Sequence, residues 1–210
     1  MTALHDTELR HTPRQRELIS VASRLFAARG YHAVGINDIS GDLGLTGPAF
    51  YRHFKSKESL LIAVLTTAIS RHLEEVGDLV AAITDPLETL DAIIANHIDF
   101  VFDETENIIL WRTEFRNLPE DDRHRLRYLQ RLYTEEWVRT VRKLRGDLPV
   151  DEVRAMCHAA IALIQSPTDY STQVERERLA PMLHHMAHTA LLGPSADAGS
   201  ATTTKAGRAR

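Results

Sequence analysis

Residues 36–54 read INDISGDLGLTGPAFYRHF, and this stretch decides the fold. Two short segments with helical character flank Gly44, a residue type that tolerates the positive φ of a sharp turn. The first segment covers residues 36 to about 43, and the second covers residues 46 or 47 to 54. This pattern predicts a helix-turn-helix, a motif whose second helix fits the major groove of B-DNA.

Helix signals continue on both sides of this motif. Thr12, Pro13 and Gln15 form a capping-box start for a helix that stops at Gly30, and Ser56 caps a long helix predicted over residues 57 to about 83. Five more helices are predicted near residues 85–101, 107–116, 120–145, 150–165 and 174–192, the last bent or restarted at Pro181. Because no alternating strand pattern and no internal repeat occurs, the sequence predicts an all-α protein of nine helices.

Composition excludes several classes of protein. A chain of 210 residues with 43% hydrophobic content can build a core, and its longest apolar stretch, residues 59–70, is too short to span a membrane. Residues 1–10 lack the apolar segment of a secretory signal, so we expect a cytosolic protein. The single cysteine, Cys157, excludes an internal disulfide. Residues 1–60 carry eight Lys or Arg against six Asp or Glu, although the whole chain has a net charge of -4. This asymmetry favours contact with a polyanion at one end.

Four features together resemble the DNA-binding domain of the TetR family of transcriptional regulators. They are residues 25–31 (LFAARGY), the Asp38-Ile39 pair, Gly44 and, above all, residues 50–58 (FYRHFKSKE). The resemblance covers residues 12 to about 65. It implies a mostly homodimeric protein with a helix-turn-helix DNA-binding domain at residues 12–57 and a helical ligand-binding and dimerisation domain at residues 58–192. Residues 193–210, rich in small and polar residues, are predicted to form a disordered tail.

The resemblance also implies which residues contact DNA. Base and phosphate contacts would fall on Asn37, Gly47, Pro48, Ala49, Tyr51, His53 and Lys57. The side chains of residues 47–49 cannot form bidentate hydrogen bonds with a DNA base. Sequence specificity is therefore expected from Asn37, Tyr51, DNA shape or bridging waters. Phe50 and Phe54 are expected to be core residues, because they lie on the face that must pack against the first helix.

The C-terminal half combines apolar and aromatic residues with a few polar groups, which is the usual composition of a small-molecule pocket. The candidate effector-binding residues are His97, Phe100, Trp111, Arg112, Phe115, Tyr133, Trp137 and His158. Each of them is also open to interpretation as plain core. Arginines at positions 116, 123, 125, 127 and 131 could bind an anionic effector such as an acyl-CoA, or form a salt-bridged helix face with nearby acidic residues.

The last two predicted helices are expected to form half of a dimer interface, a four-helix bundle between two subunits. Its candidate residues are Ala159, Leu163, Leu179, Met182, Leu183 and Met186. In an alternative interpretation His184 and His188, four residues apart on one helix face, bind a metal ion in a helical metal-binding or interaction module. The main interpretation includes no metal site.

These features predict a ligand-responsive homodimeric repressor that binds a pseudo-palindromic operator in double-stranded DNA and is released by a small, largely apolar effector. The same fold acting as an activator, or without a small ligand, is the nearest alternative. The sequence contains no dinucleotide-binding loop, phosphate-binding loop or nucleophile elbow, so we expect neither an enzyme nor a cofactor. A membrane partner is not expected either.

Overall fold

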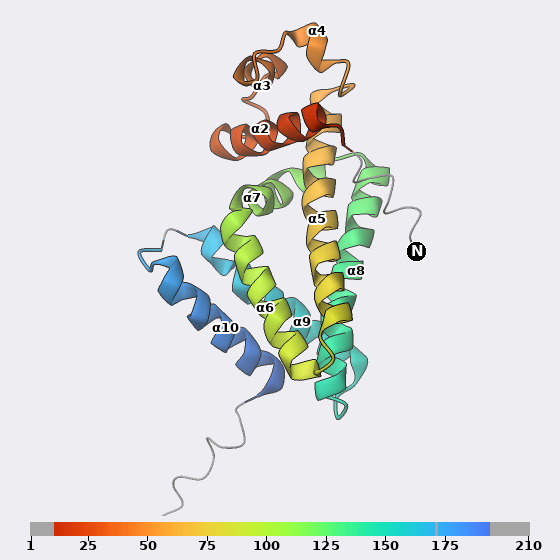
Figure 1. Cartoon of the computed structure of the whole chain (residues 1–210), viewed down its shortest axis with the longest axis vertical. Helices are drawn as coiled ribbons and strands as arrows, with labels where there is room; N and C mark the ends of the chain where they lie inside the picture. Colours follow the sequence, from red (N-terminus) through yellow and green to blue (C-terminus); the bar gives the residue numbers. More distant parts are fainter. Residues whose placement is uncertain (1–10, 171, 194–210) are drawn as a thin grey trace, which may run out of the picture.

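The computed structural model describes residues 11–170 and 172–193, and this part of the chain consists of nine α-helices and two short 3-10 helices. Their bounds are α2 Pro13–Arg29, α3 Ile36–Asp42, α4 Gly47–Phe50, α5 Lys57–Ala82, α6 Pro86–Asp103, α7 Thr105–Glu114, η1 Phe115–Asn117, α8 Glu120–Leu144, α9 Val150–Gln165, η2 Ser166–Asp169 and α10 Arg176–Leu192 (Figure 1). The predicted all-α fold with nine helices is confirmed. The predicted disordered tail lies outside the described residues except for Gly193.

The first helix begins and ends where the sequence predicts. Thr12 Oγ1 accepts a hydrogen bond from Gln15 N at 3.3 Å, and Gln15 Oε1 accepts one from Thr12 N at 2.9 Å. Gly30 follows the helix with a φ of +83°, a conformation that glycine adopts without steric cost. Local chemistry therefore fixes both ends of α2.

The second helix of the helix-turn-helix is shorter than predicted. It ends at Phe50 and not at Phe54, because the backbone tightens after it. His53 N donates to Phe50 O, three residues back, at 2.8 Å, which is the spacing of a 3-10 turn. Phe54 N also donates to Phe50 O, four residues back, at 3.1 Å. Residues 51–54 therefore form a turn with mixed 3-10 and α spacing and do not extend α4.

Two other helix bounds differ from the prediction. α7 begins at Thr105, two residues early, because a single residue, Glu104, separates it from α6. α10 begins at Arg176 and continues without restarting through Pro181, whose missing N–H removes one internal hydrogen bond.

The molecule is divided into two hydrophobic cores along one long helix. The three helices α2, α3 and α4, called here the head, lie at one end, and α5 runs from the head into the body formed by α6 to α10 (Figure 1). Leu60, Leu61 and Val64 at the start of α5 belong to the core of the head, whereas Leu73 and Val76 further along belong to the core of the body. α5 is therefore the mechanical connection between the two parts.

The core of the head also includes residues from beyond α5. Leu110 of α7, Leu118 just after η1 and Leu126 of α8 pack with Phe26 and Phe50 of the head. The domain boundary at residues 57 and 58 stays a prediction, and the apolar contacts across it are continuous.

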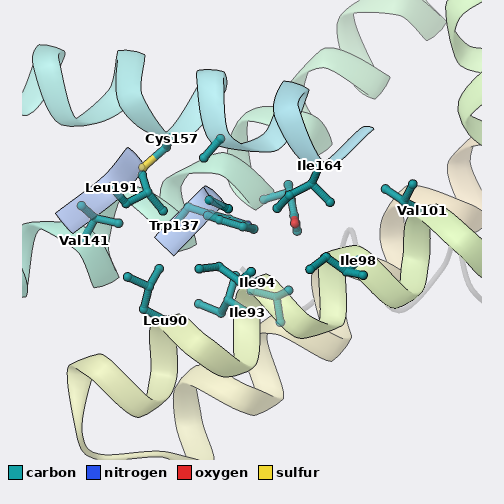
Figure 2. Close-up of a cluster of buried hydrophobic side chains, with 14 of the residues drawn as sticks. Leu90, Ile93, Ile94, Ile98, Val101, Trp137, Val141, Cys157, Ile164 and Leu191 are labelled. Atoms are coloured by element: carbon teal, nitrogen blue, oxygen red, sulfur yellow. The ribbon is translucent and has the colours of Figure 1, made fainter. Parts of the chain in front are cut away.

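The core of the body surrounds Trp137, which is fully buried (Figure 2). Leu90, Ile93 and Ile94 of α6 approach it from one side, and Cys157 of α9 lies on another (Figure 2). Burial raises the pKa of the Cys157 thiol to about 12, so the thiol stays protonated and unreactive at neutral pH. Within the described residues, no helix has the length and hydropathy needed to cross a membrane.

Candidate DNA-binding surface and effector cavity

The helix-turn-helix turn is held by backbone geometry and by burial. Gly44 has a φ of +64°, and Leu45 N donates to Ser40 O at 2.8 Å. Ile39 of α3 and Phe50 of α4 are both fully buried, which fixes the two helices against α2 and α5. Their opposite faces are left to solvent.

The predicted DNA contacts lie on this solvent face. Asn37, Pro48 and Tyr51 are exposed, with Tyr51 57% accessible. Gly47, Ala49 and His53 are half-buried. Phe50 and Phe54 are buried in the core of the head, as predicted.

Asn37 and Gly47 are in close contact across the turn. A Cβ atom built on Gly47 would lie 3.2 Å from Asn37 Oδ1, which is tighter than ordinary van der Waals contact. Glycine at this position therefore lets the Asn37 amide rest against the start of α4. The pair joins both helices of the motif at the surface that would face DNA.

Lys57 has partners inside the protein. Its Nζ donates to Tyr31 O at 2.9 Å and to Val34 O at 2.8 Å, and lies 4.3 Å from the centre of the Tyr31 ring. The ammonium has three N–H donors, so these bonds leave one for another acceptor. Lys57 anchors the loop between α2 and α3 to α5, while the neighbouring Lys55 is exposed. Its predicted phosphate contact stays a prediction.

A chain of polar side chains connects the head with the body. Ser23 Oγ of α2 donates to Asn107 Oδ1 of α7 at 2.8 Å. Asn107 Nδ2 donates to Glu104, and Glu104 accepts from Arg71 of α5. Three helices and the corner between α6 and α7 are thereby joined by hydrogen bonds.

The body contains a cavity of about 120 Å³, called here the central cavity, between α5, α6, α7, α8 and α9. The residues that line it are Leu65, Ala68, Ile69, His72, His97, Phe100, Asn107, Ile108, Trp111, Arg112, Gln130, Tyr133, Thr134, His158, Ile161 and Gln165. Arg112, Gln130 and His158 are exposed and mark the opening of the cavity to solvent. Asn107 is thus a wall residue of the cavity and a hydrogen-bond partner of the head.

Six of the eight predicted effector-binding residues line this cavity. They are His97, Phe100, Trp111, Arg112, Tyr133 and His158. Phe115 and Trp137 are not on the cavity wall. The Phe115 ring stacks on Trp111 with 4.8 Å between ring centres, and Trp137 is fully buried in the core of the body.

Five polar wall residues are absent from the predicted set: His72, Asn107, Gln130, Thr134 and Gln165. His72 is the one among them that lies at the buried end beside His97. It follows Leu65, Ala68 and Ile69 on one face of α5, the pattern of a buried stripe. A histidine that continues an apolar stripe was the signal that could have identified it.

Three polar groups meet at the buried end of the cavity. His97 Nδ1 lies 3.1 Å from His72 Nε2 and 2.9 Å from Tyr133 Oη. These three residues, called here the polar trio, are each at most 3% exposed. The His72 ring also stacks on Phe100 with 4.0 Å between ring centres.

Burial keeps the polar trio uncharged. Burial lowers the pKa of His72 to about 2, with repulsion by His97 and Arg71 adding to the effect. Burial likewise lowers the pKa of His97 to about 3 and raises the pKa of Tyr133 well above its ordinary value. At neutral pH this end of the cavity therefore offers hydrogen bonds without formal charge.

The open end of the cavity has different chemistry. Arg112 forms an ion pair with Asp169 of η2 and donates to Thr168 O at 3.2 Å. In the described part of the chain, Arg112 is the only Lys, Arg, Asp or Glu on the cavity wall. The cavity is thus neutral inside and carries one cation at its opening.

The other arginines considered for an anionic effector mostly have protein partners. Arg123 pairs with Glu120 and donates to Arg116 O, and Arg127 lies over the Phe115 ring and near Glu120. This arrangement fits the salt-bridged helix face that the sequence left open as the alternative.

The predicted dimer residues divide into two groups. Leu179 and Leu183 pack inside the core of their own subunit. Ala159, Met182 and Met186 are exposed, with 51% and 48% accessible surface for the two methionines, and Leu163 is half-buried. Among the predicted dimer residues, Ala159, Met182 and Met186 are therefore the exposed ones, and their place in an interface stays a prediction.

His184 and His188 both approach Asp91 of α6. Their Nε2 atoms lie 3.5 Å and 3.8 Å from Asp91 Oδ1. Over residues 11–170 and 172–193, no three His, Cys, Asp or Glu side chains are arranged to hold a metal ion. The structure therefore gives the metal-binding alternative no support.

An exposed helix-turn-helix on a helical body with an internal cavity defines the class of helix-turn-helix transcriptional regulators. Residues 18–64 match the family described as bacterial regulatory proteins, tetR family, and residues 84–169 match the tetracyclin repressor-like C-terminal domain. The chain belongs to the TetR family of transcriptional regulators. It is accordingly a DNA-binding transcription factor and not an enzyme.

Individual relatives agree with this assignment. The chain is 29% identical over 122 residues to the transcriptional repressor KstR2 of Rhodococcus jostii, an alignment that covers 58% of this chain and 59% of that protein. It is 32% identical over 104 residues to the transcriptional activator FasR of Mycolicibacterium smegmatis, covering 50% and 46%. The chain thus spans about half the length of these relatives.

A solved structure shares the whole fold. AibR in complex with isovaleryl coenzyme A and operator DNA superimposes with a TM-score of 0.71 at 21% identity, covering 82% of this chain and 97% of that one. At this identity the likeness concerns the fold alone.

Proposed function

We propose that this regulator is a homodimeric repressor that binds a pseudo-palindromic operator and is released when a small, largely apolar effector enters the central cavity. The main support is the position of Asn107, which lines the central cavity and accepts a hydrogen bond from Ser23 of the head. One residue thus belongs both to the effector site and to the contact surface of the DNA-binding part.

The DNA contacts proposed are Asn37, Tyr51 and the start of α4. Their exposure beside a rigid helix-turn-helix supports this role, because base-reading side chains must extend from a fixed backbone. His53, Lys55 and Lys57 supply further donors near the proposed phosphate path.

The proposed switch is a change in the position of the head relative to the body. α5 and the polar chain from Ser23 to Arg71 hold the head in one arrangement. An effector that binds better to another arrangement must weaken operator binding by the same factor by which the operator weakens effector binding. We favour repression over activation because it needs only one step: the effector displaces the head, and the operator is released.

The dimer is proposed to form through the exposed faces of α9 and α10. Exposed methionines on α10 and an exposed small residue on α9, Ala159, support a packed bundle with the same face of a second subunit. Two heads would then read two half-sites in successive major grooves. We place this regulator in the cytosol, where its operator lies.

The size of the cavity limits the proposed effector. About 120 Å³ is less than the roughly 300 Å³ at the low end of ligand pockets, so only a small molecule or the acyl end of an acyl-CoA fits. The solved relative AibR forms a complex with a coenzyme A thioester, isovaleryl coenzyme A.

The test is a fluorescence-anisotropy titration of the protein against its own upstream DNA and a scrambled duplex at two salt concentrations, with native mass spectrometry for stoichiometry. Selective binding by a dimer, reversed by an effector, is expected. Equal binding to both duplexes would contradict operator recognition in that region. Operator binding that increases with an effector would contradict release by the effector.

A further inference from the structure

The two ends of the central cavity differ in charge, and this difference identifies the class of ligand. The buried end carries the neutral polar trio, and the open end carries Arg112. Between them the wall is apolar and aromatic, with Ile108, Trp111 and Phe100 among its residues. A ligand that matches these three regions has an apolar body with one anionic end.

We infer that the effector is a short monocarboxylic acid whose carboxylate binds Arg112 and whose apolar body points toward the polar trio. This inference rests on the proposed function, because it concerns the effector of the same cavity. The class includes small aromatic and branched or straight-chain acids, with or without a hydroxyl group at the far end.

Arg112 has donors available for such a carboxylate. Its bonds to Asp169 and Thr168 O use Nη1 and Nη2, whereas a guanidinium has five N–H donors in a planar fork. The side chain of Arg112 is about half exposed, at 46%, so an incoming anion can reach it. Its partner Asp169 is also exposed, and a ligand carboxylate can replace it in the same geometry.

The buried end explains why a hydroxyl group would add affinity. His97 Nδ1 faces both His72 Nε2 and Tyr133 Oη, but a neutral ring nitrogen offers either one proton or one lone pair. One of the three groups therefore keeps unused hydrogen-bonding capacity. A charged group would not be favoured there, because the buried imidazoles are neutral and cannot compensate it.

A coenzyme A thioester places its charge differently. Its phosphates are separated from the acyl group by the long pantetheine arm, so an acyl body that fills the cavity leaves no anionic group beside Arg112. The free acid has its charge directly next to its body. The geometry thus favours the acid over its thioester.

Tryptophan fluorescence is a direct measure of binding. The chain has two tryptophans. Trp111 lines the cavity, and Trp137 lies edge-on to His97 with 5.8 Å between ring centres. Ligands that enter the cavity should change the emission of both, and isothermal titration calorimetry then gives the affinity.

The experiment titrates the full-length protein with matched sets of ligands: phenylacetate, benzoate and hexanoate, each with its alcohol, its amine and its coenzyme A thioester, and also 4-hydroxyphenylacetate. At least one acid is expected to bind at least about ten-fold more tightly than its alcohol, amine and thioester, the usual strength of a charge-assisted bond. 4-Hydroxyphenylacetate should bind several-fold more tightly than phenylacetate, and Tyr133→Phe should reduce that gain.

Variants locate the carboxylate. Arg112→Gln should weaken binding of the acid about ten-fold and leave binding of the matched alcohol unchanged, with circular dichroism to confirm folding. Arg127→Gln, on the exposed face of α8, is the matched control and should leave both affinities unchanged. Equal loss for acid and alcohol in Arg112→Gln would overturn the assignment of the carboxylate.

Other outcomes are equally decisive. Tighter binding of an amine, alcohol or thioester than of every acid, or no binding of any acid at millimolar concentration, would overturn the inference. An acid that binds the cavity without releasing operator DNA would support this ligand class and contradict the proposed release mechanism. The two proposals therefore fail in distinguishable ways.

Discussion

Ser23 Oγ donates to Asn107 Oδ1 at 2.8 Å, and this hydrogen bond joins the first helix of the head to the wall of the central cavity. Asn107 is only 9% exposed, and its Nδ2 is held by Glu104. Displacement of α7 by a bound effector would pull directly on α2. The contact is therefore a direct polar connection between cavity wall and head.

A double-mutant cycle should detect this connection. Ser23→Ala and Asn107→Ala are each expected to lower the free energy of unfolding, with a coupling of about 1 kcal/mol between them because they share one hydrogen bond. Urea denaturation of both single variants and the double variant measures the coupling. Strict additivity of the two changes would show that the bond contributes nothing. Ser20→Ala, on the same helix, is the control.

Tyr51 is expected to be an important DNA contact. Because Tyr51 is 57% exposed, Tyr51→Ala should leave folding intact and weaken operator binding about ten-fold or more. Anisotropy with operator DNA measures the loss, and thermal unfolding checks the fold. Tyr128 is also exposed but lies on α8, away from the helix-turn-helix, so the Tyr128→Ala variant should bind operator DNA like the parent protein. Full operator binding by Tyr51→Ala would falsify the contact.

Lys55 and Lys57 should respond differently to substitution. Lys55 is exposed, so Lys55→Ala should weaken binding similarly on all sequences and reduce the salt slope by about 1, without loss of stability. Lys57→Ala should show the same salt effect and also lower the free energy of unfolding by about 1.5 to 3 kcal/mol, because two loop carbonyls lose a charged donor. Urea denaturation of both variants, beside anisotropy at several salt concentrations, separates the two effects. Unchanged stability of Lys57→Ala would contradict its anchoring role.

Acid should destabilise the protein through His72 and His97. Their folded pKa values, about 2 and about 3, lie below the ordinary 6.5, so the unfolded chain binds more protons below pH 6.5. Stability contributed by these groups is present above pH 6.5 and falls as the pH drops toward 3. Each histidine should cost about 2 kcal/mol between pH 7 and pH 5.

Urea denaturation across this pH range measures the effect. The double variant His72→Phe, His97→Phe should show a clearly shallower decline, whereas His185→Phe, which alters an exposed histidine, should follow the parent protein. The same decline in the double variant and the parent would contradict the buried neutral state.

The proposed dimer face can be tested with one charge. Met186→Glu places a carboxylate on the exposed face of α10 and should shift the protein to monomers, because an unpaired charge at a buried interface is costly. Light scattering after size exclusion measures the mass. Tyr128→Glu, on α8, should stay dimeric. If the Met186→Glu variant stays dimeric, the dimer interface does not include this face of α10.

The sequence by itself determined the helical fold and the motif that places the chain in its family. The signals were local: the Thr12 capping box, the glycines at positions 30 and 44, and apolar residues at helical spacing act within a few neighbouring residues. The burial of Phe50 and Phe54 followed from the same periodicity. Local interactions of this kind can be read without knowledge of the partner helices.

Only the tertiary structure decided which side chains meet. His72 of α5, His97 of α6 and Tyr133 of α8 are far apart in sequence, and their contact depends on how three helices pack. The same packing gives Lys57 its loop carbonyls, buries Leu179 and Leu183 within the subunit, and brings Ser23 to Asn107. Helical periodicity specifies which face of a helix is buried, but the neighbour against that face is set by the global arrangement of the chain.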